Sequence, residues 1–315
     1  MKRFDVLAVG ELNPDLILAG ITAEKPRLGV EQEFQRHHLT LGSSTAISCL
    51  LMQRLGLATA MSACVGNDDY GRFCRSALDE AGVDTGMITV VAGVATGLTV
   101  CLPYPNDRLL LTAKGTMAMN PALRITPEIL RTARHLHVGS FFLQTSLRPA
   151  LADLFGMARR LGLSTSLDTG WDPDEHWLGD DLRGALAQTS YFFPNELEFQ
   201  RLTGTSDPFA GSATLRGFGV ETVVLKRGVR GAVAFGSEGR AEHSGYIAEP
   251  IDATGAGDAF NAGYLTAMLR GKPIGERLAF GNACGAMTVS AIGGTGGIES
   301  RDHVRAFVDG ARQAR

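Results

Sequence analysis

Residues 252–263, with the sequence DATGAGDAFNAG, constrain this chain more than any other stretch. Three small residues, Gly255, Ala256 and Gly257, form a turn directly before Asp258 and a helix-forming run. Glycine lets a backbone approach a ligand closely, and the start of a helix offers unpaired N–H groups and a partial positive charge, which suit phosphate. A carboxylate beside a phosphate repels it, but can take the proton from an attacking hydroxyl. The stretch therefore predicts phosphoryl transfer to an alcohol.

Two other interpretations of this stretch have to be weighed. The helix dipole stabilises any acidic residue in a first turn, and Asp258 alone is more often that than a catalyst. A dinucleotide-binding turn is the second rival, but its pattern G-x-G-x-x-G fails because Phe260 holds the third glycine position. The P-loop pattern G-x-x-x-x-G-K-[ST] is absent from the chain. A kinase with this sequence is therefore not of the P-loop class.

Residues 252–263 resemble the C-terminal signature of the ribokinase-like (PfkB) carbohydrate kinase family. Further segments resemble other motifs of the family, in the family's order, at residues 9–18, 41–56, 65–71, 194–199 and 226–231. The resemblance covers essentially all 315 residues. It implies one ribokinase-like kinase domain over residues 1–315, with a three-layer α/β/α fold and a small β-sheet lid. It also implies ATP and Mg²⁺ as cofactors, and a hydroxymethyl group of a sugar, sugar acid or nucleoside as acceptor.

The resemblance makes Asp258 the general base and lets the amides of residues 255–257 stabilise charge on the transferring phosphoryl group. Asn195 and Glu198 have two expected roles. Their spacing predicts a helix N-cap and a capping box, with Gly204 ending the helix. In the family, the same N-x-x-E motif places its carboxylate near the Mg²⁺–phosphate cluster, through water. We expect Asn195 and Glu198 to fill both roles.

Four further positions are assigned by the resemblance, and three of them have a simpler alternative. Gly228 lines the nucleotide, and Asn282 lies near the adenine unless it makes an ordinary hydrogen bond between helices. Lys226 closes a strand, where its ammonium group either reaches a phosphate or lies in solvent. Asp252 helps to hold K⁺ together with carbonyls of residues 290–296, although a plain turn explains this glycine-rich loop nearly as well.

The acceptor side has a weaker signal. Asp15 follows the first expected strand, close to Asn13, and a carboxylate can accept hydrogen bonds from two vicinal hydroxyls. A turn-capping role for Asp15 is the alternative. Gly42 would let the backbone approach the sugar. The chain departs from the family pattern at Leu41, in place of a glycine, and at Ala46, where ribokinases carry a sugar-contacting Asn, so we expect ribose to be a poor substrate.

Short apolar runs bounded by glycine alternate with helical patterns, which predicts a parallel α/β sheet covered on both faces. Strands are expected at residues 5–9, 58–65, 136–138, 164–167, 191–193, 222–226 and 232–235. Helices are expected at residues 46–55, 70–81, 148–161, 197–202, 256–269, 275–291 and 303–312.

Some extended segments carry no covering helix, at residues 15–21, 30–39, 96–102 and 108–113. Residues 103–107 are rich in turn formers and predict a hairpin connection. The family builds a lid from two such non-contiguous regions, here expected from about residues 13–40 and 92–115. A lid excludes water, which competes with the acceptor hydroxyl for the phosphoryl group. We also expect a homodimer that pairs through this lid.

The composition of the chain argues against some classes of partner and predicts the cellular compartment. A net charge of −3 and a pI near 6.2 leave no basic surface for nucleic acid. Five scattered cysteines without a C-x-x-C motif indicate free thiols in a reducing compartment. The most apolar region, residues 46–65, contains Gln53 and Arg54 and cannot span a membrane. We therefore expect a cytoplasmic protein that acts on a small sugar or nucleoside, without nucleic acid or membrane partners.

Two alternative functions stay open on the sequence. A phosphosugar kinase of the same fold would need extra cations at the acceptor pocket, and these are available on the expected lid in Lys25, Arg27, Arg36 and Arg108. The other alternative is a non-catalytic, sugar-responsive binding protein. Asp258 argues against it, because a pure binder needs no base beside a phosphate site.

Overall fold

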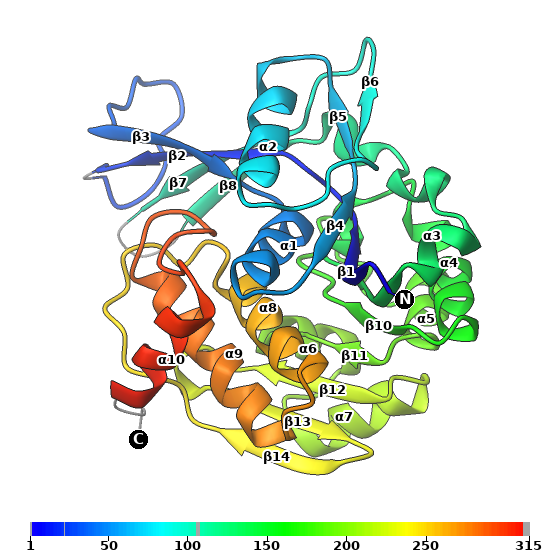
Figure 1. Cartoon of the computed structure of the whole chain (residues 1–315). Helices are drawn as coiled ribbons and strands as arrows, with labels where there is room; N and C mark the ends of the chain where they lie inside the picture. The colour runs from blue at the N-terminus through cyan, green and yellow to red at the C-terminus, as the bar shows by residue number, and fades with distance from the viewer. Residues whose placement is uncertain (1, 22, 105–107, 311–315) are drawn as a thin grey trace.

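The centre of the molecule is an eight-stranded sheet in the order β14-β13-β12-β11-β10-β9-β1-β4 (Figure 1). The computed structural model describes residues 2–21, 23–104 and 108–310. Neighbouring strands from β4 to β12 run parallel, whereas β13 and β14 pair antiparallel at one edge. The strands are β1 Phe4–Val9, β4 Thr59–Ser62, β9 Ala133–Val138, β10 Ser164–Leu167, β11 Tyr191–Phe192, β12 Thr222–Lys226, β13 Ala232–Gly236 and β14 Gly239–His243.

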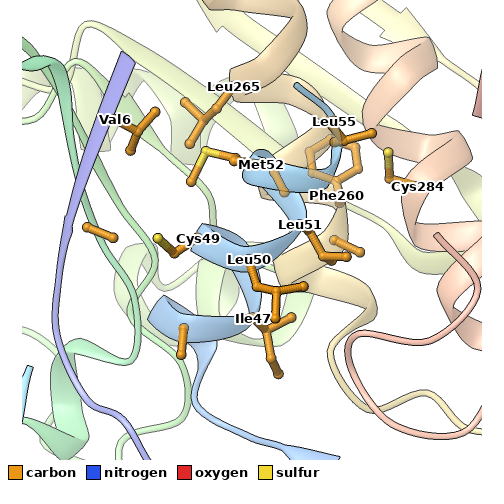
Figure 2. Packing of buried hydrophobic residues seen from close by; sticks show 14 of the residues in the cluster. Val6, Ile47, Cys49, Leu50, Leu51, Met52, Leu55, Phe260, Leu265 and Cys284 are labelled. Carbon is orange, nitrogen blue, oxygen red and sulfur yellow. The ribbon is translucent and has the colours of Figure 1, made fainter. Parts of the chain in front are cut away.

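Helices cover both faces of this sheet, because successive residues of a strand point to opposite sides. On β1, Val6 and Ala8 pack into one apolar cluster, whereas Leu7 and Val9 pack into another. Figure 2 shows the first cluster, where side chains of α1 and α8 meet Val6. The helices of the first cluster are α1 Ser44–Arg54, α2 Asp69–Glu80, α8 Ala256–Leu269, α9 Ile274–Val289 and α10 Arg301–Gly310. Those of the second are α3 Pro127–Arg131, α4 Arg148–Arg160, α5 Asp180–Leu186, α6 Glu196–Thr203 and α7 Pro208–Gly217. The predicted three-layer α/β/α fold is confirmed.

The main sheet and its helices differ from the sequence expectation at several places. The expected strand at 58–65 divides at Ala63, because β4 pairs with β1 while β5, Cys64–Gly66, pairs with β6, Thr89–Val91. Patterning misses β14, since the residues GRAEH of this edge strand include no apolar run. The expected helix at 303–312 begins two residues earlier, and residues 311–312 lie outside the described part of the chain.

A second, four-stranded sheet projects from one end of the molecule (Figure 1). Its order is β3-β2-β7-β8, with the strands β2 Pro14–Ala19, β3 Arg36–Leu41, β7 Leu98–Pro103 and β8 Arg108–Ala113. Two segments far apart in sequence meet in it, because β2 pairs in parallel with β7. Residues 30–35, expected to be extended, precede β3 and form no strand. Residues 105–107 of the expected hairpin connection lie outside the described residues.

All five cysteines carry free thiols and are buried. Burial raises the pKa of the Cys49 thiol to about 12. Among the described residues, no helix combines the length and the apolar character that a membrane crossing would need.

Candidate active site

The glycine turn at the start of α8 is shaped by close contact with a second glycine-rich loop. Gly255 is the N-cap of α8 and has φ of 72°, a conformation that favours glycine. A Cβ on Gly255 would lie 2.3 Å from the Cα of Gly294, and a Cβ on Gly294 would lie 2.5 Å from Cδ1 of Ile47 in α1. Gly294 of the 293–297 loop therefore serves the close packing of this turn against α1.

Asp258 lies in the first turn of α8, and α1 orients it. The Ser44 hydroxyl donates to Oδ1 of Asp258 at 2.5 Å, and the Ser48 hydroxyl donates to the Asp258 carbonyl at 3.1 Å. Asp258 is only partly buried, so a ligand can reach it. The structure therefore joins a helix start, a glycine turn and a fixed carboxylate, as the sequence predicts. Ser44 was missed, and its signal is a hydroxyl at the first position of a helix that faces the turn.

A buried ion pair lies beside the turn. The Lys226 ammonium donates to Oδ2 of Asp168 at 2.6 Å, and Nδ2 of Asn261 donates to the same oxygen at 2.7 Å. Burial alone would raise the pKa of Asp168, but Lys226 holds it below its ordinary value. A Cβ on Gly257 would lie 3.3 Å from the ammonium nitrogen, so Lys226 faces the turn and the solvent alternative is wrong.

Asp168 and Asn261 were missed by sequence reasoning, although both positions carry a signal. Asp168 follows directly on the buried strand β10, where carboxyl ends of parallel strands form ligand sites. Asn261 comes three residues after Asp258, and residues three apart share a face of a helix.

Asn195 and Glu198 form the predicted capping box at the start of α6. The Glu198 amide donates to the Asn195 side chain at 2.9 Å, and the Asn195 amide donates to the Glu198 carboxylate at 2.8 Å. Gly204 ends the helix with φ of 73°, as predicted. Burial, with the nearby charges of Asp168 and Asp258, raises the pKa of Glu198 to about 7, although Lys226 opposes this shift. The capping carboxylate is thus also part of the charged group around the turn.

The other nucleotide and cation candidates lie around the same edge. Gly228 is exposed just after β12, with φ of 56° and open space where a Cβ would be. Asn282 donates to Nδ1 and to the carbonyl of His243, each at 3.1 Å, so its partner is the end of β14 and the helix–helix alternative is wrong. The two carboxylate oxygens of Asp252 accept from the amides of Thr254 and Gly293, each at 2.9 Å, which joins Asp252 to the expected loop.

The acceptor candidates meet where β2 enters the small sheet. Asp15 is buried, and a Cβ on Gly42 would lie 2.2 Å from its Oδ1, so only glycine allows this approach. The Gly42 amide donates to the Asn13 carbonyl at 3.0 Å. The structure therefore brings Asn13, Asp15 and Gly42 together. Leu41 and Ala46 are both buried in the apolar core.

Three consecutive residues at the start of α1 connect the acceptor candidates around Asn13 with the glycine turn around Asp258. The Ser43 hydroxyl donates to Oδ1 of Asn13 at 2.6 Å, and Ser44 binds Asp258. The Thr45 hydroxyl donates to Oε2 of Glu11 at 2.8 Å, and burial raises the pKa of that carboxyl to about 7. Ser43 has φ of 70°, an uncommon value for a residue other than glycine, which marks a constrained backbone. Sequence reasoning missed this connection.

The residues around the turn suit Mg²⁺ bound together with a nucleotide. Among the described residues, no three His, Cys, Asp or Glu side chains come together as a metal cage. Mg²⁺ rarely uses such a cage, and is more often bound by one or two carboxylates, water and substrate phosphates. Glu198 can supply such a carboxylate through water, and the turn can supply amides for phosphate.

Comparisons with known proteins show which family the chain resembles. The family model described as pfkB family carbohydrate kinase matches residues 3–301. The chain is 25% identical to a ribokinase of Haemophilus influenzae, over 98% of this chain and 100% of that protein. It is 29% identical to an ATP-dependent ribose-1-phosphate kinase of Halopiger xanaduensis, over 96% and 97% of the two chains. A protein of E. coli designated ribokinase II, solved with ATP and Mg²⁺, superposes with a TM-score of 0.86 at 25% identity, over 97% and 99% of the chains.

Proposed function

Because the chain belongs to the pfkB family of carbohydrate kinases, we propose that it moves the γ-phosphoryl group of ATP to a hydroxymethyl group, with Asp258 as the general base. The family's members include kinases of sugars, sugar acids and nucleosides. The observation that carries the proposal is the fixed carboxylate of Asp258 beside the glycine turn. The buried free thiols fit a reducing compartment, which supports the cytoplasm as its location.

Each step of the transfer has a residue to perform it. The acceptor hydroxyl loses its proton to Asp258, which Ser44 holds in one orientation. The amides of Gly255, Ala256 and Gly257 donate to the oxygens of the transferring phosphoryl group, where negative charge has to be stabilised. When bound, Mg²⁺ neutralises charge on the phosphates, and Glu198 would orient its water ligands.

We assign Lys226 a change of partner during the cycle. Its ammonium group is buried in the ion pair with Asp168 and faces Gly257 of the anion-binding turn. A nucleotide phosphate at the turn would offer a second anion to the same cation. Asn261 also donates to Asp168, so the carboxylate keeps one hydrogen bond if the ammonium moves.

The adenosine part of ATP would lie at the edge of the main sheet where β12 and β14 end. Gly228, with open space at its Cα, would let the ring approach the backbone, and Asn282 would lie near the adenine. Asn195 caps α6 at the same edge. Asp252 and the 290–296 loop would hold K⁺, because each carboxylate oxygen keeps a free lone pair after accepting one amide.

The acceptor would bind at Asp15 on the inner face of the small sheet, which would act as its lid. Asn13 and Gly42 would contact the sugar beside the Asp15 carboxylate. A phosphosugar is a second candidate acceptor, because Lys25 and Arg27 are exposed on the segment between β2 and β3, and Arg36 is exposed at the start of β3. A relative named as a ribose-1-phosphate kinase supports this second candidate.

A panel of acceptors tests the proposal. ATP-dependent phosphorylation is measured for ribose, other sugars, sugar acids, nucleosides and phosphosugars. We expect Mg²⁺ to be required and ribose to be inferior to another acceptor. Glu198→Gln keeps the capping box and should raise the Mg²⁺ concentration for half-maximal rate about tenfold. Full activity after chelation of divalent cations would contradict the proposal.

We propose that a second copy of the chain covers the outer face of the small sheet. In the register of the sheet, Asp15 and Ile17 share the inner face, and their neighbours Leu16 and Leu18 share the outer one. On the outer face lie Leu39 and Leu111, which are 38% and 52% exposed. Light scattering should give the mass of a dimer, and Leu111→Lys should give a monomer. A wild-type monomer would refute this assembly.

A further inference from the structure

A second cavity, of about 360 Å³, lies between α8, α9 and α10. Its lining includes Thr266 and Arg270 from the end of α8, and Arg301 and Arg305 from one face of α10. We call it the three-helix cavity. Arg270 comes twelve residues after Asp258, which is about 18 Å along a helix axis, so the cavity is separate from the glycine turn.

Positive charge gathers in the three-helix cavity without strong carboxylate partners. In the part of the chain that the structure describes, no carboxylate lies within 4.0 Å of Arg270. Arg301 and Arg305 reach only Asp302, at 3.9 and 3.5 Å, beyond the roughly 2.7–2.9 Å of a good charge-assisted hydrogen bond. Burial and the charges of Arg301 and Arg305 lower the pKa of Arg270, whereas the carboxylate of Asp5 raises it. The three guanidinium groups therefore repel one another, and Asp5 offsets part of the charge of Arg270.

The carboxylates of the lining do not cancel this charge. Glu276 and Asp309 also line the cavity, but Glu276 is paired with Lys272 at 2.9 Å. Arg270 donates to the carbonyls of Gly56 and Leu55, at 2.7 and 3.4 Å, which hold its side chain in place without neutralising it. The side chains of Arg301 and Arg305 are 33% and 54% exposed. An anion would stabilise three cations that gather at one cavity.

Two buried polar atoms of the lining have no hydrogen-bond partner among the described residues. They are the hydroxyl of Thr266, a residue that is 1% exposed, and Nε of Arg301. Such atoms cost free energy unless something satisfies them, because they have given up water. Neither atom is open to the cavity in this structure, so an anionic oxygen would accept from them only after the two side chains turn. This observation is independent of the charges.

We propose that the three-helix cavity binds a small metabolite that carries a phosphate monoester. Guanidinium groups match the oxygens of a phosphate, and a dianion uses several cations at once. Ala267, Phe280 and Val308 give the cavity an apolar side, which would contact the carbon skeleton of the ligand. The volume falls within the usual range for small-ligand sites. The inference does not rest on the proposed catalytic role of Asp258.

Calorimetry of the full-length protein with glycerol 3-phosphate tests this site. The double variant Arg301→Ala/Arg305→Ala should raise the Kd about 10- to 100-fold, as expected for lost charge-assisted hydrogen bonds. Thr266→Val, which keeps the shape of the side chain, should raise it about 2- to 10-fold. The matched control Arg72→Ala/Arg75→Ala removes two exposed arginines from α2 and should leave the Kd unchanged.

The same titrations contain the results that would overturn the proposal. An unchanged Kd in both the double variant and Thr266→Val would place glycerol 3-phosphate elsewhere, for example at the glycine turn. No heat up to about 10 mM would exclude a functional site for this ligand class. Malate, titrated as a dicarboxylate of similar size, should bind more weakly, and equal affinity would show that the site does not select phosphate. Melting curves of every variant confirm that each is folded.

Discussion

The two halves of the active site are built in different ways. The phosphoryl-transfer half comes from one continuous stretch, the turn at 255–257 followed by Asp258, and buried charges surround it. The acceptor half is assembled from the end of β1, the start of α1 and a small sheet whose strands come from two distant segments. One continuous segment therefore carries the residues that predict the type of reaction, whereas the residues that would choose the acceptor come together only in the tertiary structure.

The start of α1 is where the two halves meet. Ser43 binds Asn13 on the proposed acceptor side, and Ser44 binds Asp258, the proposed base. A change in one half can therefore reach the other through a single helix turn. The comparison predicts that variants of the transfer half abolish turnover with any acceptor, while variants of the acceptor half change which acceptor is used.

The largest effect is expected at Asp258. Asp258→Asn keeps the size of the side chain but removes the base, so kcat should fall about 10²–10⁴-fold with every acceptor. Nucleotide affinity should be retained or improved, because a negative charge beside the phosphates is gone. Steady-state kinetics and nucleotide titration measure both. Ser44→Ala, which only frees the carboxylate, should cost less, and near-normal turnover in Asp258→Asn would refute the assigned base.

Lys226 tests whether the buried ion pair serves the transfer half as well as the fold. Lys226→Met leaves Asp168 buried without its cation, and the free energy of unfolding should fall by about 3–5 kcal/mol. The double variant Lys226→Met/Asp168→Asn should recover most of that stability in denaturant titrations. Its KM for ATP should nevertheless stay raised. A normal KM in the double variant would reduce Lys226 to a structural residue.

Glu11, which binds Thr45 at the start of α1, should make the free energy of unfolding depend on pH. Its pKa is raised from 4.5 to about 7 in the folded protein, so between these values the folded state binds more protons than the unfolded state. Stability from this group should therefore fall as pH rises from about 4.5 to 7, by up to about 3 kcal/mol. Glu11→Gln should remove that share of the pH dependence. Identical unfolding profiles for the two proteins across this pH range would contradict the assignment.

Asp15 should show a smaller and more selective effect. Asp15→Ala removes a carboxylate that would accept from two acceptor hydroxyls, so kcat/KM for the acceptor should fall about 100-fold. The KM for ATP should change little, because Asp15 belongs to the other half. Comparing the two constants in one variant separates the halves directly. Equal losses for ATP and for the acceptor would show that Asp15 acts through the fold.

Sequence reasoning was most successful where one segment carries the whole signal. The capping box of Asn195 and Glu198 and the turn before Asp258 depend on neighbours in the chain, and both are present in the structure. Asp168, Asn261 and Glu11 were missed because their partners are 58, 93 and 34 residues away.

Misplaced strands have a similar explanation. The polar edge strand β14 has no apolar run, because one side of it is unpaired. The apolar run at 58–65 looks like one strand, although its two parts pair with different neighbours. Pairing partners, rather than local patterning, decide where such strands begin and end.

The placement of the buried thiols makes the small sheet observable in solution. Cys101 lies on β7 beside Ile17 of β2, on the inner face of that sheet, and is 5% exposed. Cys49, Cys74 and Cys284 lie in the main apolar cluster and Cys64 on β5. Of these, Cys74 has a pKa that burial raises, and it is close enough to this face for the carboxylate of Asp15 to raise that pKa further. Any lifting of the sheet from the body would expose Cys101 first. The kinetics of thiol labelling therefore report the opening of the acceptor side separately from global unfolding, without an added label.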